Sequence, residues 1–170
     1  MARRQEIPMT DYIMLKSEIA ALCPPSFDPT ANLANAASLI FNSVEDINWA
    51  GFYILRGDRL VLGPFMGKPA CVYIPVGKGV CGTSAESRKK LVVHDVLSFS
   101  GHIACDSASR SEAVFPIFVS DRLFGVMDID STTPGRFSEV DADGLEEISA
   151  MIGKILEEGE IPENAGGKEP

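Results

Sequence analysis

The sequence is poor in basic residues and in long apolar runs. Fifteen lysines and arginines stand against twenty-four acidic residues, giving a formal net charge of −9. Such a chain repels phosphate backbones, and no stripe of basic residues offsets the charge, so a nucleic-acid partner is not expected. No apolar run approaches a membrane span, and none follows the basic start MARRQ. We therefore expect no membrane segment, no signal peptide and a cytoplasmic location.

Cysteine and histidine are also scarce. Four cysteines are too few for a disulfide scaffold in 170 residues, and no two of them form the Cys-x-x-Cys pair typical of a zinc site. The two histidines, His94 and His102, would complete a metal site only by a coincidence of folding. The sequence therefore favours thiols available for chemistry over a disulfide framework or a bound metal.

The composition present is that of an ordinary folded domain, with 45% hydrophobic and 23% charged residues. Apolar spacing predicts helices over residues 11–23, 30–44 and 138–158, with Thr30 and Ser138 as N-caps. In the first helix the apolar residues singled out by the pattern are Ile13, Met14, Ile19, Ala20 and Leu22.

Between the second and last helices, β-prone runs predominate. They predict a hairpin, a strand, a short helix, a strand and a second hairpin, at residues 49–65, 71–76, 77–87, 90–96 and 112–130. The hairpins are expected to turn at Gly57-Asp58 and Ser120-Asp121. This order indicates an α+β fold with an antiparallel sheet and helices packed on it. We expect one domain over residues 1–170, with its core at about 11–158 and a disordered tail at 159–170.

Three cysteines lie beside polar or glycine-rich turns: Cys71, Cys81 and Cys105. The stretch GHIACDSASRSE, residues 101–112, places Cys105 in a loop too polar for strand or helix, whereas cysteine is usually buried. A reactive thiolate needs a helix N-terminus or a cationic neighbour. Cys81 is expected near the start of its helix, and His102 and Arg110 flank Cys105. A structural role stays open for Cys71, and Cys23 is expected to be a semi-buried residue at a helix end.

Acidic and aromatic residues form two further groups. Asp128 and Asp130 are two apart on one strand, so they share a face, and the hairpin brings Glu112 near both. Such a cluster can be merely solvated, or it can bind an ammonium group and keep one carboxyl protonated as a general acid. Trp49 and Tyr53, four apart on a strand, pack in the core or line a pocket for a small ligand.

The segments GPFMGKPACVYIPVGKGVCGTSAES, GHIACDSASRSEAVFPIF and GVMDIDS resemble the free methionine-(R)-sulfoxide reductases, a family built on the GAF domain. The resemblance runs from about residue 48 to 137. It implies a GAF fold with a central antiparallel sheet of about six strands. It also implies reduction of free methionine-(R)-sulfoxide with a thioredoxin-like reductant, no metal or other cofactor, and allows a homodimer.

The same resemblance implies roles for individual residues. Cys105 matches the nucleophile, Cys71 the resolving cysteine, and Cys81 the third cysteine, an alternative resolving residue. The residues that match the family's substrate-binding positions are Glu112, Asp128, Asp130, Trp49 and Tyr53. In this interpretation the Cys105 thiolate attacks the sulfoxide sulfur, and the resulting sulfenic acid condenses with a second thiol. The alternative is a GAF sensor that binds a small ligand without catalysis, since fold does not fix function.

Overall fold

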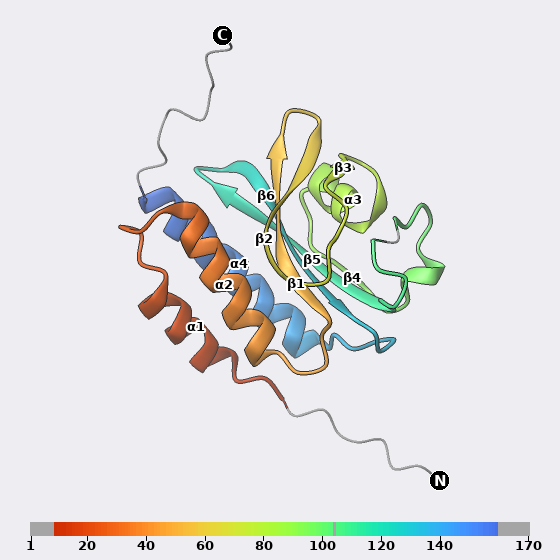
Figure 1. The fold of residues 1–170 in the computed structure, drawn as a ribbon, viewed down its shortest axis with the longest axis horizontal. Helices are drawn as coiled ribbons and strands as arrows, with labels where there is room; N and C mark the ends of the chain where they lie inside the picture. The colour runs from red at the N-terminus through yellow and green to blue at the C-terminus, as the bar shows by residue number, and fades with distance from the viewer. Residues whose placement is uncertain (1–8, 104, 160–170) are drawn as a thin grey trace.

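The computed structural model describes residues 9–103 and 105–159, which form helices around one sheet (Figure 1). The helices are α1 (Tyr12–Leu22), α2 (Pro29–Ser43), α3 (Gly79–Ser87) and α4 (Glu139–Glu158), with a short 3-10 turn at Val96–Ser98. The strands are β1 (Trp49–Arg56), β2 (Arg59–Gly67), β3 (Tyr73–Pro75), β4 (Leu91–Val93), β5 (Ser111–Val119) and β6 (Arg122–Ser131). The part of the predicted tail after residue 159 lies outside the described residues.

The strands form one six-stranded sheet in the order β3-β2-β1-β6-β5-β4, and every neighbouring pair is antiparallel. This confirms the predicted α+β class and the antiparallel sheet. The two hairpins turn where the sequence places them, with Gly57, Ser120 and Asp121 at positive φ. Positive φ in a tight turn matches the right-handed twist of the paired strands.

Helices cover the sheet unequally. Helices α1, α2 and α4 lie on one face, and the shorter α3 lies on the other (Figure 1). The first face holds the larger core, where Phe52, Phe115 and Met127 of the central strands pack against Leu33 and Ile148 of the helices. Alternate residues of the same strands point to the α3 face. That second face is the one on which the chemistry-bearing side chains gather.

Of the two predicted N-caps, the one for α2 is wrong and the one for α4 is confirmed. The N-cap of α2 is Asp28 and not Thr30, because the Asp28 carboxylate accepts hydrogen bonds from the backbone N–H groups of Thr30 and Ala31. Pro29 follows it at the first helical position, which proline favours. The start of α4 is confirmed: Ser138 and Asp141 form a reciprocal capping box.

The buried face of α1 also differs from the predicted one. Of the five residues named, only Ile19 is buried, and the others are exposed. The buried residues are Tyr12, Leu15 and Ile19, followed by Cys23, which is fully buried rather than semi-buried and donates its thiol proton to the carbonyl of Asn32. The Tyr12 hydroxyl donates to Asp141 of α4, 2.7 Å away, and this bond turns the tyrosine inward.

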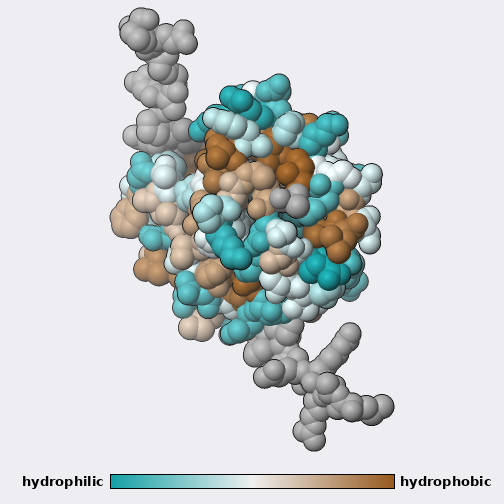
Figure 2. Space-filling model, turned by 45° about the vertical axis from the view of Figure 1, so that its right-hand side comes forward, coloured by the Kyte–Doolittle hydropathy of each residue, from teal (hydrophilic) through white to brown (hydrophobic). Residues whose placement is uncertain are grey.

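None of the helices within the described ranges has both the length and the apolar character that crossing a membrane requires. Hydrophobic side chains on the face shown in Figure 2 gather in separate patches between hydrophilic ones, and do not form one continuous apolar surface.

Candidate active site

Three carboxyl groups converge on the α3 face of the sheet. Glu112 of β5 lies directly opposite Asp130 of β6 in the antiparallel ladder, and Asp128 is two residues further along β6 on the same face. Glu112 and Asp128 are buried, and Asp130 is partly buried. The hairpin thus brings these residues together as the sequence predicts.

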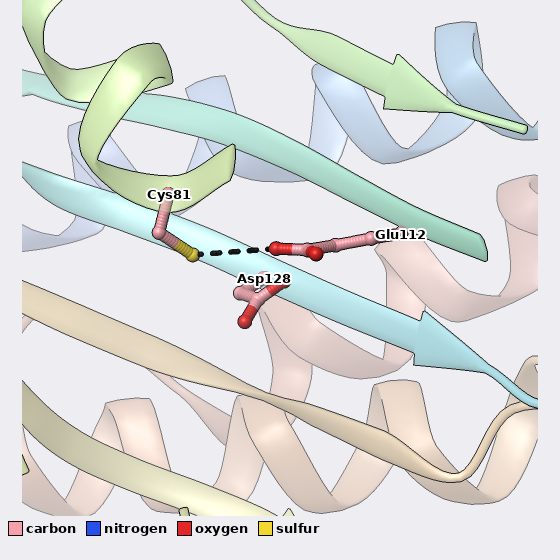
Figure 3. Close-up of side chains that lie close together, drawn as sticks. All are labelled: Cys81, Glu112 and Asp128. Carbon is pink, nitrogen blue, oxygen red and sulfur yellow. Dashed lines mark hydrogen bonds between the residues drawn. The ribbon is translucent and has the colours of Figure 1, made fainter. Parts of the chain in front are cut away.

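Helix α3 places a thiol over the carboxyl groups. Cys81 is the third residue of α3, is 3% exposed, and has its Sγ 3.7 Å from Glu112 Oε1. The side chains of Cys81, Glu112 and Asp128 point toward one another between the helix and the sheet (Figure 3). The Cys81 sulfur and one carboxyl oxygen from each acid lie within 4.8 Å of one another. The predicted position near the start of the helix is confirmed.

Burial dominates the electrostatics of this cluster. It raises the pKa of Asp128 to about 7. It also raises the pKa of Glu112 and of Asp130 well above the usual range, and the charge of Asp128 raises both further. Carboxyl groups in such a setting hold protons near neutral pH and can donate them. Burial, and then the neighbouring carboxylates, raise the pKa of the Cys81 thiol, which favours the neutral thiol.

A disulfide joins the other two turn cysteines. Cys71, between β2 and β3, is bonded to Cys105 of the polar loop, with their Cα atoms 5.4 Å apart. Cys23 and Cys81 are the free thiols. Of the two partners for Cys105 that the sequence leaves open, the structure places Cys71 in the bond.

Side chains from distant segments fasten the loop that contains Cys105. The Asn48 amide donates to Asp106 Oδ2 at 3.2 Å and to Ser109 Oγ at 3.1 Å. Sequence reasoning missed Asn48, because its partners lie 58 and 61 residues away and leave no local pattern. Arg110, expected as a cationic neighbour of Cys105, instead forms an ion pair with Asp95 at 2.9 Å.

The two histidines lie in different surroundings. His102 lines the cavity beside the carboxyl groups, with Nε2 3.7 Å from Glu112 Oε2, and burial lowers its pKa. His94 is not among the residues that line this cavity. The two histidines therefore do not meet at one site with the cysteines.

Aromatic side chains form one wall of the site. Trp49 stacks between Tyr53 and Phe65, with ring centroids 5.9 and 5.3 Å apart. The Tyr53 hydroxyl donates to the backbone carbonyl of Cys71, and the Trp49 indole N–H donates to that of Lys68. The predicted shared face of Trp49 and Tyr53 is confirmed, and their polar atoms also hold the segment that leads to Cys71.

One glycine makes room for this wall. Gly51 lies between the two aromatic residues on β1 and opposite Asp128. A Cβ atom there would lie 2.7 Å from the Trp49 ring, closer than side chains tolerate. The absence of a side chain at this position thus lets the indole lie across the strand.

The walls enclose a small cavity of about 40 Å³. The named side chains that line it are Trp49, Tyr53, Cys81, His102, Cys105, Asp106, Ser109, Glu112, Asp128 and Asp130. About 10–15 Å³ suffices for one water molecule, so the cavity has room for a few waters when the disulfide is formed.

Comparison with known proteins places this geometry in a family. A GAF domain family model matches residues 30–157. A free methionine-R-sulfoxide reductase of Escherichia coli (strain K12) is 49% identical over 145 residues, covering 85% of this chain and 88% of that protein. The structure of fRMsr of Staphylococcus aureus in its reduced form has a TM-score of 0.86 and 47% identity, covering 89% of this chain and 99% of that chain.

A third relative has been solved with its substrate bound. The structure of free methionine-R-sulfoxide reductase from Neisseria meningitidis in complex with its substrate has a TM-score of 0.84 and 37% identity. The match covers 92% of this chain and 97% of that chain. With its six-stranded sheet, its disulfide and its buried carboxyl cluster, this chain belongs to the GAF-domain family of free methionine-R-sulfoxide reductases.

Proposed function

We propose that this protein reduces free L-methionine-(R)-sulfoxide to methionine, using Cys105 as the nucleophile and Cys71 as the resolving thiol. The observation that supports this most strongly is the Cys71–Cys105 disulfide, because Cys105 lines the same cavity as Glu112, Asp128 and Asp130. A thiol pair that can be oxidised and a group of proton-donating carboxyl groups thus lie at the same cavity. Both are needed to remove an oxygen atom from a sulfoxide.

In the first step, the reduced Cys105 thiolate attacks the sulfoxide sulfur. The sulfoxide oxygen accepts a proton from the carboxyl cluster and is transferred to the Cys105 sulfur. Methionine leaves, and Cys105 becomes a sulfenic acid. The raised pKa of Asp128, about 7, suits an acid that is protonated in part near neutral pH.

In the second step, the Cys71 thiol attacks the sulfenic sulfur, and water leaves as the disulfide forms. An external dithiol of the thioredoxin type then reduces the disulfide by thiol exchange, which returns both cysteines to the thiol state. The sum is one sulfoxide and two thiols converted to one thioether, one disulfide and one water. Cys81 is less suited to resolve Cys105, because burial keeps it a neutral thiol and it is not part of the disulfide.

Substrate recognition is assigned to the carboxylates and the aromatic wall. The ammonium group of free methionine sulfoxide forms charge-assisted hydrogen bonds with the acidic cluster, and the methyl group on the sulfoxide sulfur packs on Trp49 and Tyr53. Because these carboxylates are buried, a substrate without a free ammonium leaves them unpaired, which lowers its affinity.

The small cavity implies movement during the cycle. A space of about 40 Å³, with Cys105 held in the disulfide at its wall, leaves little room for a molecule of the size of methionine sulfoxide. Substrate therefore binds after reduction of the disulfide has freed the loop of Cys105 to move outward. We further propose a cytoplasmic location, where reducing dithiols are abundant, and a homodimer as the assembly.

The experiment compares three substrates on one enzyme preparation: free methionine-(R)-sulfoxide, its N-acetyl derivative and the S epimer. We expect kcat/KM at least ten- to hundredfold lower for the acetylated form, about 1.4–2.7 kcal/mol on the transition state. The S epimer should not react, because its oxygen points away from the acids. Equal values for the free and acetylated forms would remove the carboxyl cluster from the binding model. No methionine from any substrate would instead favour a GAF sensor without catalysis.

A further inference from the structure

Beside the carboxyl groups of Glu112 and Asp128 lies a thiol, Cys81, that the proposed sulfoxide chemistry does not use. Cys81 takes no part in the Cys71–Cys105 bond, yet its sulfur is held 3.7 Å from a carboxylate oxygen (Figure 3). Asp128 is 6% exposed, and its Oδ1 is buried without a hydrogen-bond partner among the described residues. A buried oxygen without a partner costs free energy, which a ligand at this position would recover.

We propose that Cys81, Glu112 and Asp128 form a binding site for a thiophilic divalent cation such as Zn²⁺ or Cd²⁺, and that the bound cation excludes the substrate. The second half of this proposal rests on the proposed function, since it assumes that the substrate ammonium binds the same carboxylates. The first half concerns metal binding alone and stands without it.

The distances fit a tetrahedral zinc ion. Zinc binds thiolate sulfur at about 2.3 Å and carboxylate oxygen at about 2.1 Å, so at the tetrahedral angle these two ligands lie about 3.6 Å apart. Cys81 Sγ and Glu112 Oε1 are 3.7 Å apart. An Asp128 oxygen is within 4.8 Å of both, so a small side-chain rotation closes the third ligand position.

The ligand types select the class of metal. A thiolate is a soft ligand that favours zinc and similar ions over magnesium and calcium, which prefer sites made entirely of oxygen. Three protein ligands leave a fourth tetrahedral position for water, and the cavity of about 40 Å³ has room for it. When the cation binds, the thiol proton and any protons on the two carboxyl groups are released to solvent.

A metal bound here blocks the site at its most polar point. Glu112 and Asp128 would be engaged by the cation and could neither pair with an ammonium group nor donate a proton. Free methionine sulfoxide and the cation should therefore bind in competition with each other.

The test of binding uses the oxidised protein, in which the disulfide removes two of the four thiols. Cd²⁺ alone is titrated, and the ultraviolet absorption of thiolate-to-cadmium charge transfer is followed. We expect the band in the wild type and in the control Cys23→Ser, and its loss in Cys81→Ser. Asp128→Asn retains the thiol and should weaken Cd²⁺ binding at least tenfold. Absence of the band in the wild type, its persistence in Cys81→Ser, or unchanged affinity in Asp128→Asn would overturn the site.

The test of competition uses the double variant Cys71→Ser/Cys105→Ser, which has no nucleophile and so should bind the sulfoxide without turnover. Cd²⁺ affinity is measured with and without saturating free methionine-(R)-sulfoxide. We expect the sulfoxide to weaken Cd²⁺ binding at least tenfold. Unchanged Cd²⁺ affinity while the sulfoxide is bound would overturn the competition. Cd²⁺ binding with no binding of the sulfoxide would count against the proposed function and leave the metal site in place.

Discussion

Replacing Asp128 with asparagine should make the protein more stable at neutral pH and less active. Burial raises the pKa of Asp128 from 3.8 in the unfolded chain to about 7 in the folded protein. Between these two values the folded protein binds more protons than the unfolded chain does, so the free energy of unfolding falls as the pH rises. Each pH unit is worth about 1.4 kcal/mol, so above pH 7 the loss approaches about 4 kcal/mol.

An asparagine at this position does not titrate, and it also removes a negative charge that raises the pKa of Glu112 and Asp130. The free energy of unfolding of the wild type should therefore fall relative to that of the variant as the pH rises from 4 to 7.5. The difference, variant minus wild type, becomes more positive over this range. The expected growth is about 2–4 kcal/mol. At the same time kcat/KM for free methionine sulfoxide should fall at least tenfold, because the variant cannot donate a proton or pair with an ammonium group.

The assay is urea unfolding of both proteins at pH 4, 5, 6 and 7.5, with linear extrapolation to zero denaturant. Asp58→Asn, in the exposed turn between β1 and β2, serves as the reference for a neutralised carboxylate away from the cluster. A stability difference for Asp128→Asn that stays within about 0.5 kcal/mol across this range, as surface substitutions usually do, would refute the reasoning.

Three further predictions concern the disulfide step. Cys71→Ser should release one methionine per chain and then stall with thioredoxin as reductant, as measured by product per enzyme; continued turnover would move the resolving role to Cys81. Asn48→Ala removes two hydrogen bonds that hold the Cys105 loop, which together contribute about 1–2 kcal/mol. It should slow disulfide formation after a single turnover, which is measured as the loss of free thiol with time. Tyr53→Phe keeps the ring but loses the bond to the Cys71 carbonyl, so the same assay should show slower disulfide formation, while steady-state kinetics should show little change in KM. An unchanged rate in either variant would contradict its proposed part.

Local patterns in the sequence predict much of this fold. The hairpin over residues 112–130 follows from two β-prone runs around a turn, and the antiparallel register then places Glu112 opposite Asp130. The capping box of Ser138 and Asp141 is equally local. These predictions are confirmed because each depends on residues close together in the chain.

Other features depend on contacts between distant segments. The buried face of α1 includes Tyr12, whose hydroxyl reaches Asp141 across 129 residues, and a hydropathy pattern gives no sign of this bond. Thr30 is a plausible N-cap by residue type, but the Asp28 carboxylate accepts hydrogen bonds from the N–H groups of Thr30 and Ala31, so the helix already begins at Pro29. The choice between Cys71 and Cys81 as the partner of Cys105 likewise required three-dimensional placement, since both lie beside turns.

The most direct test of the central claim is a single-turnover measurement of methionine release without added reductant. Fully reduced wild-type protein, mixed with excess free methionine-(R)-sulfoxide, should yield one methionine per chain, and peptide mapping should then show the Cys71–Cys105 disulfide. Cys23→Ser, a change in a buried cysteine outside the cavity, should match it in product and in disulfide. Cys105→Ser should release none, because a hydroxyl is far less nucleophilic toward sulfur. Methionine released by Cys105→Ser, or a Cys81–Cys105 disulfide in the wild type, would contradict the account.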